Sequence, residues 1–458
     1  MATSVSPAAR KAPARKASGR RRWFEWHSWV GVVAGLLLFI ICWSGTFATL
    51  SRELDWLTTP AMRVSASETA SPTVVDIHDA VAKAMPEATI AYVWLSDQPG
   101  FAPLAYAKMP DHTLRQVYVD PVSLRVTGST SAVNVQRFFR DLHMDFFGLL
   151  GWGKFAVCIF AIPLLISAVT PLVFYKRWWR RFFDLRTDKG AKALWSSLHK
   201  LAGLWSLWFV AAIGITGAWY LFEETRIEAL DGKFAWVDSY PLAVHPLPPL
   251  HRAESEMLPF GELVAAARRY APELEITGAS TDRNGYFYVE GKTDALLVRD
   301  RANKMYLDPA NARLVYYQTA DDLSAYWRWS DMADPVHFGT WGGMTTKIVW
   351  FLFGLALSGL SLTGGWLHVQ RMQRQGAGSR WSGAALAAAT GIAITLFCLV
   401  VAVLRAFQAS PAGTGYWPDV TPGTAVIALL WFASTLAVGI TWLVCLRPRR
   451  SPSARAVR

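Results

Sequence analysis

Six long apolar stretches constrain the fold of this chain more than any other feature of its sequence. Each is long enough to cross a bilayer, which takes about 20 apolar residues in a helix. They predict spans at 23–50, 154–175, 199–222, 345–370, 383–405 and 423–446. Because lipid cannot hydrogen-bond to the backbone, a chain crosses it as helices or as a closed barrel. The expected fold class is an α-helical integral membrane protein, and a content of 52% hydrophobic residues agrees with it.

The basic residues predict the orientation of the chain. If the spans alternate, four basic runs fall on one side: Arg10–Arg22, Lys176–Lys192, Arg371–Arg380 and the tail after Leu446. The positive-inside rule makes this the cytoplasmic side, so the tails 1–22 and 447–458 and the loop 176–198 are expected there. Segments 51–153 and 223–344 then lie in the periplasm of a bacterial inner membrane. The net charge of +12 is explained without nucleic-acid binding, because these runs flank the spans.

The first span is expected to remain as an anchor. Its apolar run is longer than that of a signal peptide, and no small-residue cleavage site follows it. The four cysteines, Cys42, Cys158, Cys398 and Cys445, all fall inside spans. They form neither a disulfide framework nor a C-x-x-C-H attachment site, so any haem is expected to be non-covalent and b-type.

Two parts of the chain repeat each other. W-H-S-W-V-G at 26–31 and L-H-K-L-A-G at 198–203 open the first and third spans with the same H-x-x-x-G spacing. V-Y-V-D-P at 117–121 is echoed by M-Y-L-D-P at 305–309. The chain is therefore predicted to hold two copies of span, external domain and span, which form a four-helix core, with two further spans appended.

Each external segment is expected to fold into a small α+β domain. Amphipathic helices at Val75–Ala84 and Phe260–Tyr270 precede alternating strands, and Asn284-Gly285 marks a turn. The Asp-Pro pairs at 120–121 and 308–309 are expected to cap turns at strand ends. Four further histidines are expected at the surface of these segments: His78, His112, His245 and His251.

His27 and His199 begin spans that both enter from the cytoplasm. In a four-helix bundle with pseudo-two-fold symmetry, the first and third spans lie diagonally, so the two imidazoles can hold a haem iron between them. Gly31 and Gly203 follow four residues later on the same helix face. A missing side chain there would admit the edge of a porphyrin, or would allow close packing of a neighbouring helix.

His143 and His337 lie before the second and fourth spans, on the outer side, and are expected to form a second axial pair. Trp152 and Trp341 would cover a haem face or belong to the interfacial aromatic belt. Arg137, Arg140 and Lys154 are candidate partners for haem propionates.

His368 ends the fourth span and has no histidine counterpart in the first copy. It could replace His27 or His199 as a ligand, bond a propionate, or extend towards the headgroups. A zinc site is not expected, because neither H-x-x-x-H nor H-E-x-x-H spacing occurs.

The paired H-x-x-x-G openings, the outer D-L-H and D-P-V-H positions and the repeated D-P turns resemble the PepSY-associated transmembrane helix family over residues 20–375. The resemblance implies an iron-regulated inner-membrane protein with two PepSY-like periplasmic domains, and some members are di-haem siderophore reductases. It also implies two haem b groups on His27, His199, His143 and His337. Ferric-chelate reduction would then occur near the outer haem.

The preferred hypothesis is a haem-b oxidoreductase that passes electrons across the membrane to a ferric siderophore or another ferric chelate. No G-x-G-x-x-G follows a strand, so the electron donor is expected to be separate, either a quinol or a cytoplasmic flavoprotein. Two alternatives stay open. One is a non-enzymatic membrane regulator or binding protein that inhibits a peptidase or senses an envelope ligand. The other is a transporter, although its spans would lack the paired charged residues that transport usually needs.

Overall fold

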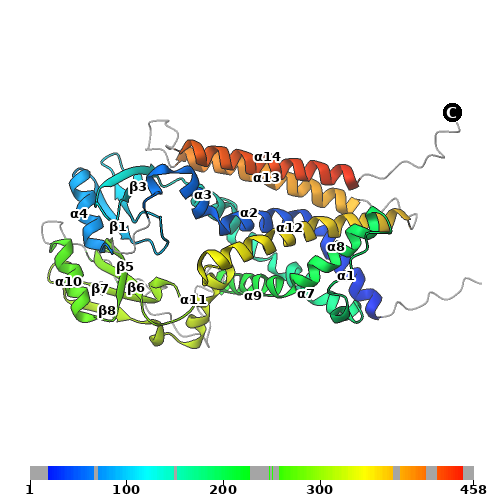
Figure 1. The fold of residues 1–458 in the computed structure, drawn as a ribbon, viewed down its shortest axis with the longest axis horizontal. Helices are drawn as coiled ribbons and strands as arrows, with labels where there is room; N and C mark the ends of the chain where they lie inside the picture. The colour runs from blue at the N-terminus through cyan, green and yellow to red at the C-terminus, as the bar shows by residue number, and fades with distance from the viewer. Residues whose placement is uncertain are drawn as a thin grey trace, which may run out of the picture.

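The computed structural model describes residues 19–65, 71–148, 152–226, 247, 250, 257–374, 382–408 and 420–446. Figure 1 shows a long bundle of helices with a β-sheet domain at one end. His245, His251, most of the basic run Arg10–Arg22, the end of the run Arg371–Arg380 and the C-terminal tail fall outside the described residues.

Apolar helices form the bundle, as the hydropathy of the sequence predicts. Among the described residues, three are straight enough and long enough to cross a membrane: Gly153–Phe174, Gly343–Gln373 and Pro422–Leu446. Two helix pairs qualify if each bent pair counts as one span: Gly19–Val33 with Gly35–Thr49, and Ala191–Trp205 with Leu207–Glu224. The protein is thus a helical membrane protein with three to five candidate spans among the described residues.

The two bent pairs break at corresponding positions. The first bends by 67° at Ala34 and the second by 62° at Ser206, each seven residues after its histidine. The helices before the breaks are α1 (Gly19–Val33) and α8 (Ala191–Trp205), and those after them are α2 (Gly35–Thr49) and α9 (Leu207–Glu224). The sequence analysis treated both segments as single straight spans, and the bends separate the inner histidines from the outer parts of these helices.

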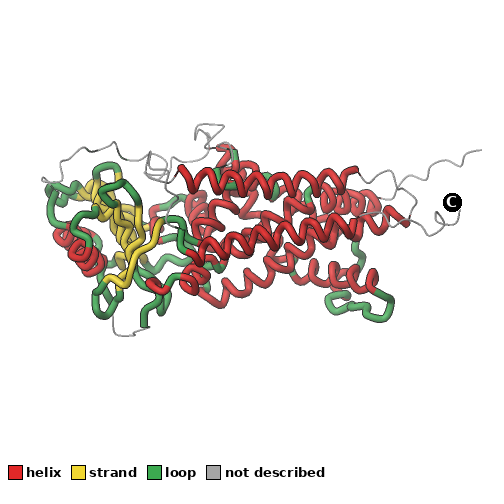
Figure 2. The backbone as a smooth tube through the Cα atoms, turned by 90° about the horizontal axis from the view of Figure 1, so that it is seen from above, coloured by secondary structure: helices red, strands yellow, loops and turns green. Residues whose placement is uncertain are grey.

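The core spans are arranged so that the first and third lie diagonally. α1 packs against α7 (Ala161–Phe174), α7 against α9, α8 against α12 (Gly343–Arg374), and α2 against α12. α6 (Gly153–Cys158) leads into α7. Two further helices, α13 (Ser382–Gln408) and α14 (Pro422–Leu446), lie along the side formed by α2 and α12 (Figure 1). Figure 2 shows the helices gathered in one bundle, with the strands beyond one of its ends.

Segments 51–153 and 223–344 supply the strands of one antiparallel sheet, eight strands in the order β4-β3-β2-β1-β5-β6-β7-β8. The first segment supplies four strands: β1 (Thr89–Trp94), β2 (Leu104–Lys108), β3 (Leu114–Val119) and β4 (Val126–Ser131). The second supplies the other four: β5 (Glu275–Arg283), β6 (Tyr286–Lys292), β7 (Asn303–Leu307) and β8 (Leu314–Gln318). The segments join edge to edge where β1 pairs with β5, with Val93 opposite Ala279. Pairing removes two exposed strand edges, which would otherwise be open to other chains.

Two helices cover one face of the sheet, where they bury the core of this domain. α4 (Val74–Ala84) and α10 (Phe260–Tyr270) match the amphipathic helices predicted from the sequence to within one residue. Their apolar faces pack with alternate strand residues such as Val93, Ala279 and Val289. This cluster contains residues of both segments, which locks them together.

The predicted turns are present. Asp120 accepts hydrogen bonds from the backbone N–H groups of Val122 and Ser123, and Asp308 accepts one from Ala310. Asn284 and Gly285 both have positive φ, at 59° and 82°, as a two-residue hairpin turn requires. His112 is exposed as expected, whereas His78 is half-buried and stacks on Phe260 of the second segment.

Each edge strand leads to a short helix that returns the chain to the membrane. In the first segment the edge strand β4 is followed by α5 (Val135–Asp145), and a separate helix, α3 (Ser51–Thr58), leads from the first span to the sheet. In the second segment α11 (Ala325–Phe338) follows β8. The sheet therefore anchors the beginning of both α5 and α11, the helices that carry the two outer histidines.

Candidate functional site

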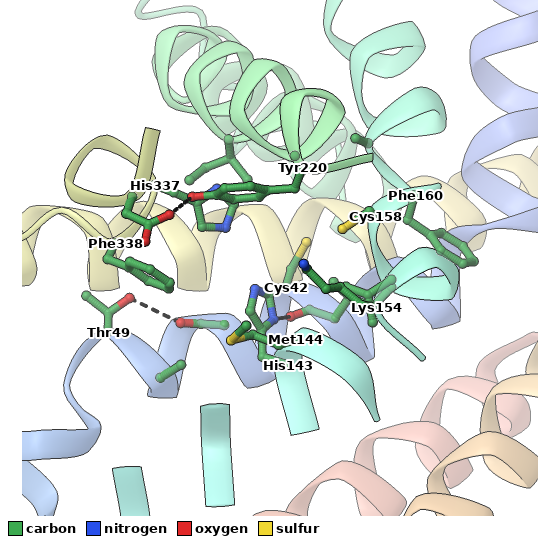
Figure 3. Close-up of a pocket in the computed structure, with 18 of the residues that line it drawn as sticks. Cys42, Thr49, His143, Met144, Lys154, Cys158, Phe160, Tyr220, His337 and Phe338 are labelled. Atoms are coloured by element: carbon green, nitrogen blue, oxygen red, sulfur yellow. Dashed lines mark hydrogen bonds between the residues drawn. The ribbon is translucent and has the colours of Figure 1, made fainter. Parts of the chain in front are cut away.

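His143 of α5 and His337 of α11 face each other across a cavity. Their ring centres are 6.1 Å apart and the ring planes are inclined by 34°. The cavity has a volume of about 440 Å³ and lies mainly among helices of the bundle, with Arg299 and Arg301 of the sheet domain also in its lining. Figure 3 shows the two imidazoles pointing into it from different helices. The structure thus brings together two histidines that are 194 positions apart in the sequence.

Hydrogen bonds orient His143. Its Nδ1 lies 3.0 Å from the carbonyl oxygen of Ile41 and 3.3 Å from the hydroxyl of Ser44, both on α2. A carbonyl can only accept, so we assign the ring proton to Nδ1. The ring also lies directly over Gly45, where a Cβ atom would be 2.6 Å from the Cε1 of His143. The lone pair on Nε2 is left for a ligand.

His337 is held in the same way. Its Nδ1 lies 2.7 Å from the hydroxyl of Thr216 on α9. That hydroxyl donates its own proton to the carbonyl oxygen of Ala212 at 2.7 Å, so it accepts from the imidazole. Nε2 again carries the lone pair. Partners of this kind fix the tautomer and the orientation of ligating histidines.

Burial keeps both outer imidazoles neutral. They belong to α5 and α11, outside the spans, and burial lowers the pKa of His143 to about 4 and that of His337 to about 3. A metal ion binds the unprotonated nitrogen of a neutral imidazole. At neutral pH both side chains are therefore in the form that can bind iron.

The inner histidines have equivalent partners. His27 Nδ1 lies 3.0 Å from the hydroxyl of Thr170, and His199 Nδ1 lies 2.8 Å from that of Thr363. Both hydroxyls donate to backbone carbonyls of their own helices, at Ile166 and Gly359. They consequently accept from the imidazoles and leave each Nε2 free of a proton.

The glycines of the two H-x-x-x-G motifs differ in their surroundings. A Cβ atom on Gly31 would meet nothing within 4 Å in the described part of the chain, whereas one on Gly203 would be in ordinary van der Waals contact with Leu360 of α12 at 3.9 Å. Gly203 therefore packs against a neighbouring helix and Gly31 does not. Room for a porphyrin edge beside these glycines stays a prediction.

His368 differs from the other four histidines. Its Nδ1 lies 2.8 Å from the Ser28 hydroxyl and 3.2 Å from Nη2 of Arg371. Arg371 can only donate, and it also donates to Ser28 at 3.0 Å, which leaves the Ser28 proton free to point at His368. Nδ1 is therefore an acceptor and the ring proton belongs on Nε2. In this tautomer Nε2 has no lone pair for a metal.

Charged side chains line the outer part of the cavity. Five are basic and three are acidic: Arg140, Lys154, Arg226, Arg299 and Arg301, with Glu223, Asp331 and Asp334. Arg299 pairs with both aspartates, and Tyr220 donates to Asp334 at 2.7 Å. The lining has an excess of two positive charges, which suits an anionic group at this end.

Not all the predicted partners reach this cavity. Arg140 and Lys154 line it, and Lys154 also pairs with Glu224. Arg137 points away, with its side chain 65% exposed and bonded to Asp141 at 2.6 Å. Trp152 and Trp341 are 68% and 53% exposed, as the aromatic-belt alternative requires. Trp327 and Trp350 are the tryptophans that line the cavity.

Asp55 fixes the start of the helix that carries His143. Its carboxylate accepts hydrogen bonds from the backbone N–H groups of Val135 at 2.7 Å and Gln136 at 2.8 Å. These are unpaired donors at the first turn of α5, where a negative charge also interacts favourably with the helix dipole. Asp55 is itself 1% exposed.

Replacing Asp55 with alanine should loosen α5. We expect a loss of about 1–3 kcal/mol in the free energy of unfolding, since buried donors lose their acceptor. Thermal unfolding in detergent and hydrogen exchange at 135–138 measure this. Asp111→Ala, which removes an exposed cap of a local turn, is the control. Equal effects of the two substitutions would contradict the role of Asp55 in fixing the start of α5.

The hydroxyl partners were not identified from the sequence, although it contains a signal for them. Ser44 lies 17 residues after His27, and Thr216 lies 17 residues after His199. Extending the repeat beyond the H-x-x-x-G motif would have aligned them. Tyr220, Asp334 and Arg299 gave no such signal, because their contacts join separate segments.

A sequence model of the family described as the PepSY-associated TM region matches residues 24–371. The match covers α1 to most of α12 and leaves out α13 and α14. An uncharacterized protein of Pseudomonas aeruginosa is 32% identical over 79 residues, which are 17% of this chain and 20% of that protein. The aligned part is thus about one fifth of the relative's length.

Proposed function

This chain belongs to the family of PepSY-associated TM regions, and from that premise we propose that it is a haem-b oxidoreductase of the bacterial inner membrane. It would move electrons from the cytoplasmic side to a ferric siderophore or another ferric chelate in the periplasm. The proposed topology has six spans and both termini in the cytoplasm. Basic side chains between α7 and α8, such as Arg177 and Arg181, support this orientation.

The observation that carries the proposal is the geometry of His143 and His337. Two metal–imidazole bonds of about 2 Å, with the metal on the line between the rings, place the ring centres roughly 6 Å apart. The two ring centres are 6.1 Å apart in the structure. These two imidazoles would hold the iron of a bound haem, which would supply a one-electron carrier at this site.

Two haem b groups, when bound, would supply one-electron carriers near the two faces of the membrane. The residues of the chain hold and tune them. His143 and His337 would be the axial ligands of the outer haem, and His27 and His199 those of the inner one. Nδ1–H donation to Ile41, Thr216, Thr170 and Thr363 raises the basicity of each ligand and fixes its orientation.

The basic lining explains how the outer end would receive anions. Arg140, Lys154 and the neighbouring arginines lie where propionates or an anionic ferric chelate would meet the protein. Reduction weakens the binding of iron by hard oxygen ligands, so the chelate would release it. The electron donor would be a quinol or a cytoplasmic flavoprotein at the opposite face.

The threonine partners offer a direct test of ligand tuning. Thr216→Val keeps the shape of the side chain and removes the hydroxyl that accepts from His337. Loss of such a partner typically costs about 10–100-fold in metal affinity or activity, so outer haem should be retained correspondingly less well. Thr225→Val is the matched control, because Thr225 also donates to a carbonyl of α9 but does not contact His337. If Thr216→Val retains haem as well as Thr225→Val does, the role of Thr216 in orienting His337 is contradicted.

His368 is proposed as a hydrogen-bond donor to a propionate, not as an axial ligand. His368→Gln should therefore leave both haems six-coordinate, with unchanged α and Soret bands. His199→Gln should remove the inner haem in the same assay. Five-coordinate haem iron in His368→Gln would show instead that His368 is an axial ligand and that the tautomer assignment is wrong.

Visible spectroscopy of the purified protein tests the function as a whole. We expect two b haems per chain by pyridine haemochrome, with dithionite-reduced spectra typical of six-coordinate iron. The reduced protein should be reoxidised by a ferric siderophore. A colourless protein, even with haem supplied during expression, would overturn the proposal in favour of a non-enzymatic regulator.

A further inference from the structure

The hairpin of α13 and α14 lies outside the part of the chain that matches the family. In the described part of the chain α14 packs on α5, whereas neither helix of the hairpin contacts α11 to a comparable extent. We propose that it is a brace for α5 and that Trp431 is a positioning residue for His143. The expected effect on haem rests on the proposed function, whereas the expected effect on the stability of α5 does not.

Aromatic side chains form the contact between α14 and α5. The ring of Trp431 lies 6.4 Å from that of Phe138 and 6.1 Å from that of Phe139, both in edge-to-face geometry. Phe432 approaches Phe138 at 5.7 Å. On its other side Phe139 stacks on Phe47 of α2 at 5.6 Å. α5 is thus clamped between α14 and α2, and His143 lies one turn after Phe139.

The clamp is tightly packed. Trp431 is 3% exposed, and Phe139 is completely buried. The indole N–H of Trp431 is buried without a hydrogen-bond partner in the described part of the chain. A buried N–H without a partner costs free energy. The contribution of Trp431 to stability therefore comes from the packing of its ring, not from a hydrogen bond.

The rest of the hairpin is fitted closely to the bundle. Trp442 donates to the carbonyl oxygen of Leu362 at 3.0 Å and lies against Gly365 of α12. Gly391 of α13 lies against Leu36 of α2, where a Cβ atom would come within 2.6 Å of that side chain. Such contacts make the hairpin a fixed support.

The second copy holds its histidine helix differently. Four and five residues before His337 are Ala333 and Met332, where α5 has Phe139 and Phe138. α11 is tied instead by Asp331 and Asp334 to Arg299, and by Asp334 to Tyr220. The corresponding positions of α5 are Arg137 and Arg140, and in the described part of the chain Arg137 bonds to Asp141 of its own helix. Beyond the cap that Asp55 supplies at its start, α5 is therefore held by packing against α2 and α14, where α11 is tied by ion pairs.

The test compares Trp431→Ala with Leu430→Ala in the full-length protein in mild detergent. Leu430 is the neighbouring residue of α14 and is 64% exposed. We expect Trp431→Ala to speed hydrogen exchange in α5 by about tenfold or more, with α11 unchanged. We also expect it to shift the midpoint potential and the low-spin electron paramagnetic resonance signal of one haem, or to release that haem, while the other stays as in the wild type. Leu430→Ala should change neither readout.

Two results would overturn the brace: wild-type exchange in α5, or equal changes in α5 and α11. Faster exchange in α5 with both haem signals unchanged would overturn the positioning role of Trp431. If Trp431→Ala does not fold, Trp431→Leu decides by the same measurements, because it removes the aromatic ring, keeps an apolar side chain and forfeits no hydrogen bond. If the wild-type protein binds no haem, the proposed function fails, and the exchange comparison still decides whether the hairpin braces α5.

Discussion

Replacing His143 or His337 with alanine is expected to remove about half of the bound haem and to leave the fold intact. Each imidazole would supply one of two axial bonds at the outer site, and neither has a nearby histidine to replace it among the described residues. With one strong axial bond left, the outer haem is lost or becomes five-coordinate. The pyridine haemochrome assay and the reduced α band measure both outcomes.

His112→Ala is the control for this experiment. His112 is exposed in a turn of the sheet domain, so its removal should leave two haems per chain. Loss of both haems from His143→Ala and from His337→Ala would point to general unfolding, which size-exclusion chromatography detects. Retention of both haems with wild-type spectra would exclude these two residues as ligands.

A single methyl group at Gly45 is expected to have nearly the same effect as removing His143. The Cβ atom of alanine at this position would lie 2.6 Å from Cε1 and 3.0 Å from Nδ1 of the imidazole. Atoms do not approach so closely, so the ring must move away from Ile41 and lose its hydrogen bond. We expect the outer haem to be retained about tenfold less well or worse, a loss of the size seen when partners of metal ligands are removed.

Gly19→Ala is the control for Gly45→Ala. Both glycines belong to the same bent pair of helices, Gly19–Val33 with Gly35–Thr49. The Cβ atom at Gly19 would meet nothing within 4 Å among the residues that the structure describes, and Gly19 has no part in either proposed haem site. Gly19→Ala should therefore keep both haems, and any loss in Gly45→Ala reports the collision with His143. Equal haem contents in the two variants would contradict the close packing of His143 on α2.

Much of the architecture follows from local properties of the sequence. The amphipathic pattern at 74–84 and 260–270 predicted α4 and α10, and the Asp-Pro and Asn-Gly pairs predicted turns that are present. These features depend on residues that are close together in the chain. The edge-to-edge pairing of β1 with β5 was not predicted, because it depends on two segments separated by about 180 residues.

The choice among alternative roles also needed three-dimensional contacts. The sequence left His368 as ligand, propionate partner or interfacial residue, and its position beside Ser28 and Arg371 now argues against the first. For Trp152 the sequence left two roles, covering a haem face or belonging to the interfacial aromatic belt. The exposure of the Trp152 side chain favours the aromatic belt. The bends at Ala34 and Ser206 were not predicted, although Gly35 and Ser206 lie at the breaks and such residues favour kinks in helices.

By itself the sequence determined that the chain is a membrane protein, which family it resembles, and that five histidines lie at the ends of apolar segments. Hydrophobicity and helical hydrogen bonding act over neighbouring residues, and a lipid environment leaves the backbone few alternatives. The tertiary structure alone decided that His143 and His337 lie 6.1 Å apart, and which atoms orient them. Those distances are set by how helices far apart in the chain pack together, so the spacing of residues along the chain cannot fix them.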